Sequence, residues 1–290
     1  MQGKVGTSNF VHKVLNEHNL HAKKKFGQNF TTDQNILSTI IDAAELNETI
    51  AVIEIGPGLG SLTERLCKAC GFVLCYEIDE ELIPVLKNNL KDYSNFEVIH
   101  QDILDVDINK DIKEKLSAYQ KIYVVANLPY YITTPIILGL LSKTNLITRY
   151  VMMMQLEVAD RICGKPKTKD YNALSIAIGY RCVATKVCKV PRTVFIPTPN
   201  VDSAVVRLDL YDEKKYQVLN EEFFFTFIKQ CFMQRRKTLI NNLSSIYPKA
   251  FILKMLEENH IEPTVRSEEL GIEDFIPVSY THLTLPTIRL

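Results

Sequence analysis

Apolar runs alternate with amphipathic stretches along the first 165 residues of the chain. The runs are short and rich in β-branched and aromatic residues, a composition typical of buried strands. We expect strands near 50–55, 72–78, 96–100, 122–126 and 149–155. Helices are expected near 61–69, 80–91, 111–118, 134–142 and 156–163. This alternation predicts an α/β fold with a doubly wound, Rossmann-like sheet whose strands are mostly parallel.

The pattern changes after residue 180. Residues 182–190 and 203–210 are both β-rich, and the proline-rich segment 191–199 that joins them has no helical pattern. Without a helix to cross the sheet, the two strands are expected to pair as an antiparallel hairpin at the sheet edge.

Helical periodicity replaces the strands beyond residue 211, and the predicted helices have charged faces. This part is therefore expected to be all-α, with a domain boundary near residue 211. We expect helices at 221–242, 248–259 and 267–274.

The predicted organisation is two domains and a tail. An α/β domain covers residues 1–210, with 1–24 partly flexible, and a small all-α domain covers 211–277. The last stretch, 278–290, is rich in threonine and lacks helical periodicity. We interpret it as a tail outside both domains, a candidate for an artefactual addition to the chain.

A glycine-rich turn follows the first predicted strand. Residues 52–61 read VIEIGPGLGS, and their G-x-G-x-G spacing differs from the G-x-G-x-x-G fingerprint of dinucleotide-binding proteins. Glycine lets a ligand approach the backbone closely, so Gly56 and Gly58 are candidate ligand contacts. A plain tight turn is the alternative interpretation.

Acidic residues close the next two predicted strands. Glu77 ends the run FVLCYE, nineteen residues beyond Gly58, and Asp102 ends VIHQD. In open α/β sheets ligands bind outside the carboxyl ends of the strands, and an acid at about 20 residues from the glycine turn can bind ribose hydroxyls. We therefore expect Glu77 to bind the ribose of a nucleoside and Asp102 to accept a hydrogen bond from its adenine.

The tetrad Asn127-Leu128-Pro129-Tyr130 follows the apolar run IYVVA. The Asn127 amide oxygen can accept a hydrogen bond from an exocyclic amino group, with the Leu128 carbonyl as a second acceptor. Pro129 has no N–H and stiffens the loop, and Tyr130 offers a flat face to an unstacked base. The tetrad thus predicts transfer of a group onto the amino nitrogen of a planar base, with an ordinary turn as the alternative.

Five short sequence motifs lie between residues 25 and 239, in the order in which one protein family has them. They are KFGQNF at 25–30, EIGPGLG at 54–60, NLPYYI at 127–132, FIPTPNVDS at 195–203 and QRRKTL at 234–239. In this order the chain resembles the bacterial 16S rRNA adenine dimethyltransferases, and the five motifs together are far more specific than any one of them. The chain departs from the family at Thr31, because the family usually has leucine after the phenylalanine of GQNF.

The resemblance implies an S-adenosylmethionine methyltransferase whose acceptors are two adjacent adenines near the 3′ end of 16S rRNA, each dimethylated on N6. The RNA partner is the small ribosomal subunit or its precursor. A sulfonium methyl donor is already activated, so no metal is expected. The expected cofactor-binding residues are Gln28, Asn29, Thr31, Gly56, Gly58, Glu77, Asp102 and Asn127. The expected catalytic residues are Asn127, Leu128, Pro129, Tyr130 and Phe195, with Tyr130 and Phe195 stacking on the target base.

Formal charge gives no argument for a nucleic-acid partner, because 34 basic residues balance 34 acidic ones. Local clusters are better candidates. On a helix, the side chains of residues 235–237 would fan over roughly 200° and could not all be buried. A solvated surface or an interdomain salt bridge is the alternative. The candidate RNA-binding residues are Lys23, Lys24, Lys25, Arg235, Arg236 and Lys237.

Seven cysteines without regular pairing indicate reduced thiols of a cytoplasmic protein. Cys67 and Cys70 form a lone C-x-x-C without a second pair at zinc-like spacing, which favours structural thiols. No run of 18 apolar residues is present, so we expect no membrane span. The expected oligomeric state is a monomer.

Three other functions remain open. A 23S rRNA adenine methyltransferase of the erythromycin-resistance type has the same fold and similar motifs, although Leu128, residues 131–132 and 201–203, and the helical tail favour the 16S enzyme. A non-catalytic RNA- or DNA-binding factor for transcription or ribosome assembly is disfavoured by the intact cofactor motifs. A DNA amino-methyltransferase is disfavoured because no separate DNA-reading domain is visible.

Overall fold

The computed structural model of the protein describes residues 6–18, 20–23 and 26–283. These residues form two compact units. The first contains the described residues up to 159 together with 184–210. The second contains residues 160–183 together with the described residues from 211 onward.

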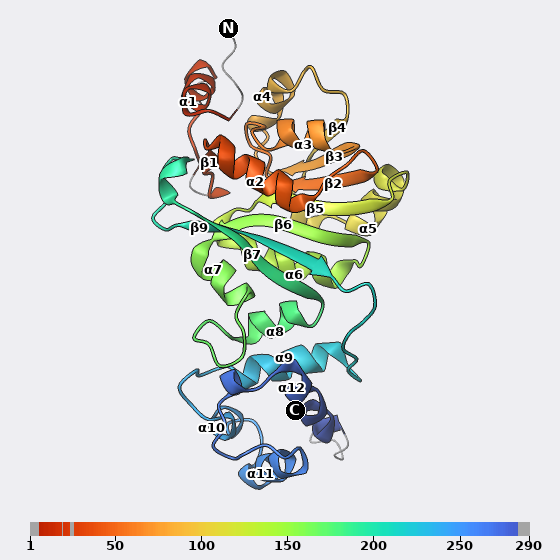
Figure 1. Ribbon diagram of the computed structural model, residues 1–290, viewed down its shortest axis with the longest axis vertical. Coiled ribbons are helices and arrows are strands. Elements are labelled where there is room, and N and C mark those ends of the chain that lie inside the picture. The colour runs from red at the N-terminus through yellow and green to blue at the C-terminus, as the bar shows by residue number, and fades with distance from the viewer. Residues whose placement is uncertain (1–5, 19, 24–25, 284–290) are drawn as a thin grey trace. The chain divides into compact units, whose positions relative to one another are not determined.

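A seven-stranded sheet forms the centre of the first unit, in the order β4-β3-β2-β5-β6-β9-β7 (Figure 1). Strands β2 to β6 run parallel to one another, and β9 is antiparallel to β6. The predicted doubly wound sheet is confirmed, and so is the adjacency of β7 and β9 at its edge. The strands are β2 (Ile50–Ile55), β3 (Phe72–Glu77), β4 (Phe96–His100), β5 (Lys121–Asn127), β6 (Ile147–Gln155), β7 (Cys182–Val190) and β9 (Ser203–Leu210).

The helices between these strands also follow the predicted alternation. The π-helical turn Ile112–Leu116 continues α5, and α1 and α2 were not predicted from the sequence. The helices are α1 (Ser8–Glu17), α2 (Gln34–Ala44), α3 (Thr63–Ala69), α4 (Leu82–Asn89), α5 (Ile108–Asp111), α6 (Thr133–Lys143) and α7 (Leu156–Ile162).

Helix α2 packs on one face of the sheet. Asp33 caps its N-terminus by accepting hydrogen bonds from the N–H groups of Asn35 and Ile36. Leu37, Ile40 and Ala44 lie on one face of the helix and pack in a core cluster with residues of β2, β3, β5 and β6. This packing places the segment before α2 beside the carboxyl ends of the strands.

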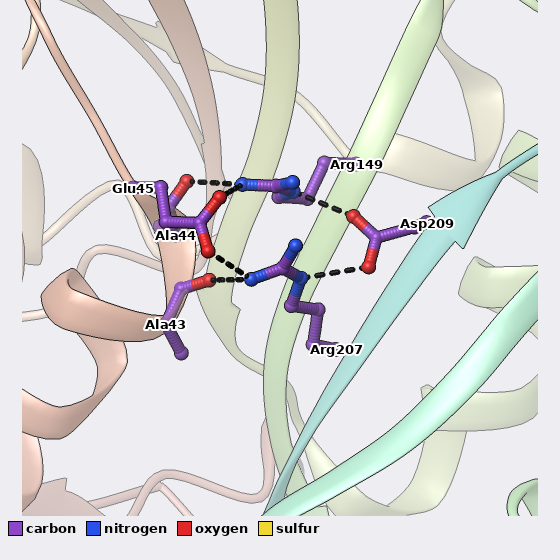
Figure 2. Close-up of polar contacts among 6 residues, drawn as sticks. All are labelled: Ala43, Ala44, Glu45, Arg149, Arg207 and Asp209. Carbon is purple, nitrogen blue, oxygen red and sulfur yellow. Dashed lines mark hydrogen bonds and ion pairs between the residues drawn. The ribbon is translucent and has the colours of Figure 1, made fainter.

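A ring of two arginines and two carboxylates fixes the C-terminal end of α2 to the sheet (Figure 2). Glu45 has φ 53° at the end of α2, and its two oxygens accept from Arg149 of β6 at 2.7 Å and Arg207 of β9 at 2.6 Å. Asp209 binds the Nε atoms of both arginines at 2.7 Å. The arginines also donate to the carbonyl oxygens of Ala44 and Ala43, which have no partner further along the helix.

A second, two-stranded sheet connects segments that are far apart in the sequence. Strand β1 (Phe30–Thr31) is antiparallel to β8 (Phe195–Ile196), with Phe30 opposite Ile196 and Thr31 opposite Phe195. Two of the five sequence motifs, GQNF and FIPTP, are therefore neighbours in the fold.

The second unit is helical around its own apolar core. Residues 160–183, placed with the α/β domain by the sequence pattern, group with this unit because Ile176 and Tyr180 pack with Phe224 and Phe227. Pattern alone could not assign them, since an apolar helix face does not identify its partner. The helices are α8 (Ala173–Gly179), α9 (Glu221–Cys231), α10 (Leu239–Leu243), α11 (Lys249–Glu258) and α12 (Ile272–Leu283).

The predicted single helix 221–242 is wrong, because α9 and α10 are separate. Asn242, which is 4% exposed, donates to the carbonyl oxygens of Cys231 and Gln234 and accepts from the N–H of Gln234. Thr238 caps the start of α10. These bonds stabilise a turn at residues 232–238.

The predicted tail at 278–290 is also corrected up to residue 283, because α12 extends through Leu283. Val278 is fully buried with Phe275 in the core of the second unit, so burial outweighs the weak helical pattern. Residues 284–290 lie outside the described residues.

Candidate active site

A cavity opens at the carboxyl ends of β2, β3 and β5, where the order of the sheet reverses. This is the place where open α/β sheets bind ligands. Most of the sequence-predicted catalytic and cofactor residues line it. Its polar and aromatic lining includes Gln28, Asn29, Thr31, Glu54, Glu77, Asp102, Asn127, Tyr130 and Tyr131.

The glycine-rich turn after β2 forms one wall of the cavity. The φ angles of Gly56, Gly58 and Gly60 are 67°, 57° and 89°. Residues with a Cβ rarely adopt this backbone conformation. A Cβ on Gly56 would meet no atom within 4 Å, whereas a Cβ on Gly58 would lie 3.2 Å from the Phe30 ring. The space beside Gly56 lets a ligand approach the backbone closely.

Glu77 ends β3 and is 4% exposed. One carboxylate oxygen accepts the N–H of Gly58 at 3.1 Å, and the other accepts the N–H of Asp79 at 2.9 Å. Burial raises the pKa of Glu77, and these backbone hydrogen bonds act in the opposite direction. Each oxygen keeps a further lone pair for a ligand hydroxyl, so the group is held ready to bind a diol.

Asp102 follows β4 and begins a short 3₁₀ turn at Ile103–Asp105. Its Oδ1 accepts the N–H of Leu104 at 2.9 Å, which fixes the carboxylate at the cavity wall. Glu77 and Asp102 thus lie in one cavity, as their positions at successive strand ends predict.

The amide of Asn127 has a defined orientation. Its Nδ2 donates to the backbone carbonyl of Asn29 at 3.1 Å and lies 3.5 Å from Thr31 Oγ1. Because a carbonyl can only accept, the atom facing Asn29 must be the amide nitrogen. The Asn127 oxygen is therefore the end that can accept from a ligand in the cavity.

The other three residues of the tetrad are also held in place by burial or hydrogen bonds. Leu128 is 1% exposed, and its N–H binds the carbonyl of Met153 at 3.0 Å. Pro129 accepts from the Thr133 hydroxyl at 2.9 Å. The Tyr130 hydroxyl lies 2.6 Å from Ser203 Oγ, which fixes its half-buried ring in the cavity lining.

Phe195 is not placed to stack on a base. It is 1% exposed, packs in the core cluster of the first unit, and is absent from the cavity lining. A ring with no free face cannot receive a base, so the structure corrects the predicted stacking role of Phe195. Tyr131, next to Tyr130, lines the cavity instead and is 53% exposed.

Gln28 reaches the cavity, but its polar atoms are engaged by protein groups. Its Oε1 accepts the N–H of Lys23 at 2.8 Å, and its Nε2 donates to Asp79 at 2.7 Å. The backbone of Asn29 and the hydroxyl of Thr31 face Asn127 instead. Residues 28–31 therefore contact Asp79 on one side of the cavity and Asn127 on the other.

The predicted RNA-binding residues have different surroundings. Lys23 binds Asp79 and Glu81 at 2.8 and 2.9 Å, so its charge is neutralised within the protein. Lys24 and Lys25 lie outside the described residues. In the second unit, Arg235 binds Glu268 at 2.9 Å, whereas Arg236 and Lys237 are exposed in the turn that precedes α10.

Sequence reasoning missed two acids near the cavity. Asp79, 3% exposed, lies two residues after Glu77, and only that spacing could have indicated it. Glu54 is 1% exposed and lines the cavity, and burial raises its pKa to about 8. The sequence signal that could have identified Glu54 was its position in the EIGPGLG motif. A carboxyl with that pKa is mostly protonated at pH 7 and can donate a hydrogen bond.

Neither a metal centre nor a membrane span is found in the described part of the chain. No three His, Cys, Asp or Glu side chains among the described residues are grouped so that they could hold a metal ion. None of the described helices combines the length and apolar content needed to cross a bilayer.

Comparison with known families gives one consistent result. The model of the family described as ribosomal RNA adenine dimethylase matches residues 19–281. The chain is 46% identical over 280 residues to the ribosomal RNA small subunit methyltransferase A of Lysinibacillus sphaericus, covering 95% of this chain and 96% of that protein. It is 46% identical over 277 residues to the protein of the same name from Streptococcus mutans, covering 94% and 95%.

Solved structures agree. A dimethyladenosine transferase from Plasmodium falciparum is similar with a TM-score of 0.71 and 28% identity, covering 86% of this chain and 95% of that one. The 23S rRNA methyltransferase ErmE is similar with a TM-score of 0.67 and 26% identity, covering 87% and 99%.

Proposed function

The chain belongs to the ribosomal RNA adenine dimethylase family, and from this premise we propose that it dimethylates N6 of two adjacent adenines near the 3′ end of 16S rRNA. The relatives at 46% identity are small-subunit enzymes by name. The observation that supports the chemistry most directly is the anchored amide of Asn127, whose oxygen is the end left to accept from an amino group.

The residues of the cavity fit S-adenosylmethionine, the cofactor that the family implies. Gly56 leaves space where a ligand can approach the backbone. Glu77 offers a carboxylate fixed by two backbone N–H groups to a ribose, and Asp102 lines the same cavity for an adenine. When bound, this cofactor supplies an activated methyl group on a sulfonium.

The task left to the protein is to orient the target amine. Accepting the amine's hydrogens at Asn127 Oδ1 and the Leu128 carbonyl favours a nitrogen lone pair that is directed rather than delocalised into the ring. Holding the reacting atoms in this arrangement lowers the barrier by up to about 7–11 kcal/mol. Tyr130 can hold the base by stacking, which tolerates the loss of a hydrogen after the first methylation.

The experiment that tests the function is methylation of ribosomal subunits with labelled S-adenosylmethionine, followed by mapping of the modified bases. The proposed function predicts two dimethylated adenines in 16S rRNA of the small subunit. Label in 23S rRNA would instead identify the erythromycin-resistance type of activity. Label in DNA alone, or none in any substrate, would reject the proposal.

Tyr130 is expected to act through its ring rather than its hydroxyl. Tyr130→Ala should lower kcat/KM for RNA by roughly 5- to 150-fold, because base–aromatic stacking contributes about 1–3 kcal/mol. Tyr130→Phe should keep most of the activity, although it loses the contact with Ser203. Ser203→Ala is the matched control for that contact. Equal losses in the Phe and Ala variants would show that the hydroxyl is the functional group.

Arg236 and Lys237 are the best-placed candidates for phosphate contacts in the second unit, because both are exposed. The Arg236→Ala, Lys237→Ala protein should bind small subunits more weakly, with a salt dependence whose slope falls by about 1 for each lost contact. Arg235→Ala should change the slope less, since Glu268 already binds that guanidinium. An unchanged slope in the double variant would place RNA recognition elsewhere.

We infer that the protein acts in the cytoplasm, where its ribosomal substrate is assembled. The monomeric state stays a prediction, and sedimentation of the purified protein would test it.

A further inference from the structure

Asp79 connects the cofactor side of the cavity with the N-terminal segment. Its backbone N–H donates to Glu77 Oε1 at 2.9 Å, so the same residue helps to hold the carboxylate proposed to bind ribose. Its own carboxylate accepts from Lys23 Nζ at 2.8 Å and from Gln28 Nε2 at 2.7 Å. The side chain is 3% exposed, although it is charged and outside the proposed chemistry.

The two partners of Asp79 are also joined to each other. Gln28 Oε1 accepts the backbone N–H of Lys23 at 2.8 Å, so Asp79, Lys23 and Gln28 form a closed set of three hydrogen bonds. Gln28 belongs to residues 26–31, all of which line the cavity. Residues 29 and 31 of this stretch in turn accept from the Asn127 amide.

The charge balance of this set favours the closed arrangement. Burial would raise the pKa of Asp79, but the hydrogen bonds from Lys23 and Gln28 outweigh it and hold that pKa below its ordinary value. Without Lys23 the buried carboxylate would keep its desolvation cost but lose its charged partner, and only the neutral donors Gln28 and the Glu81 N–H would remain. Glu81 binds the same lysine at 2.9 Å from the exposed side, with 62% of its side chain accessible.

We propose that Asp79 and Lys23 are positioning residues that clamp residues 26–28 over the cofactor site. This inference rests on the proposed function, because it assumes that Glu77 binds the cofactor ribose. The clamp joins the wall that holds the ribose to the wall that orients Asn127. Lys23 therefore belongs to cofactor retention rather than to RNA binding, the role that its basic cluster suggested.

The clamp predicts a specific kinetic signature. With the clamp broken, residues 26–28 spend more time away from the cavity, because residues 29–31 keep their contacts with Asn127 and β8. The bound cofactor then escapes faster. The affinity for S-adenosylmethionine should fall mainly through a faster dissociation rate. The effect on KM for the cofactor should exceed any effect on kcat, because the groups that align the amine are retained.

The test measures binding of S-adenosylhomocysteine, the reaction product, to the full-length protein without RNA, by calorimetry and stopped-flow dissociation. Lys23→Met and Asp79→Asn should each weaken binding about tenfold. The double variant should bind no more than about twofold more weakly than either single variant, because both substitutions remove the same interaction. Lys115→Met is the matched control. It breaks a 2.6 Å ion pair with Glu97 that lies outside the cavity lining.

Hydrogen exchange adds a readout that simple destabilisation would not reproduce. In the wild-type protein the ligand should slow amide exchange of residues 26–28, and in Lys23→Met this protection should largely disappear while the sheet remains protected. If Asp79→Asn does not fold, Lys23→Met still tests the clamp, because the lysine side chain is 26% exposed. Lys23→Arg should restore affinity.

Unchanged affinity and exchange in Lys23→Met, or fully additive losses in the double variant, would overturn the clamp. These outcomes are distinct from failure of the proposed function. If the wild-type protein itself bound no S-adenosylhomocysteine, the assignment of the cavity would fail; if the wild type bound it and the variants bound equally well, only the clamp would fail.

Discussion

Asn127→Ala is expected to lower the rate of methyl transfer by about 100-fold or more while leaving the first unit folded. The Asn127 oxygen is the group that we propose accepts from the target amine, and small misplacements of reacting groups can cost roughly 100-fold in rate. The variant also loses the hydrogen bond from its amide nitrogen to Asn29. Its effect should therefore combine lost alignment of the amine with a looser cavity wall.

Single-turnover methylation of small subunits, with enzyme in excess, measures this effect on the chemical step. Asn109→Ala is the matched control, because its amide donates to the Lys143 carbonyl on an exposed surface outside the cavity. Binding of Asn127→Ala to small subunits should persist. A single-turnover rate within threefold of the wild type would remove Asn127 from the proposed chemistry.

Glu77→Ala should produce the largest loss of cofactor affinity. A hydrogen bond to a charged group contributes about 1.5–3 kcal/mol, which corresponds to roughly 10- to 150-fold weaker binding of S-adenosylmethionine. The variant also leaves the N–H groups of Gly58 and Asp79 without their acceptor. Calorimetry of the purified protein measures the affinity directly.

Two further variants separate ligand binding from support of the glycine turn. Glu77→Gln keeps an oxygen acceptor of the same shape and should lose less affinity than Glu77→Ala. Glu97→Ala removes an acid whose ion pair lies outside the cavity and should bind like the wild type. Equal affinity of Glu77→Ala and the wild type, with a normal melting temperature, would refute the ribose assignment.

The central sheet could be predicted from sequence because its inner parallel strands are buried on both faces, whereas β4 at the edge is only half-buried. Such strands read as continuous apolar runs, and every residue of β2 is buried. The turn at 232–238 could not be predicted, because it depends on the side chain of Asn242 satisfying backbone groups of α9 and the turn. Helical pattern contains no information about such a bond.

The candidate site likewise contains residues that could be predicted from the sequence and residues that could not. Glu77, Asp102 and Asn127 are strand-end residues, so the topology of the sheet brings them to one cavity and sequence position was enough to find them. The burial of Phe195 and the ion pairs of Lys23 could not be predicted, because both depend on distant partners. Phe195 packs in a core that joins several strands, and Lys23 meets a carboxylate 56 residues away. A lysine that binds phosphate and one that binds a buried aspartate look alike in sequence.

The second unit is built from two separated segments, and this limits how the protein can be divided. A chain ending at residue 210 would keep α8 but lose α9, so Ile176 and Tyr180 would lose the aromatic partners of their core. Such a truncation is expected to aggregate rather than report on catalysis without the helical unit. A chimera that borrows this unit from a relative would have to exchange residues 160–183 and the segment from 211 onward together.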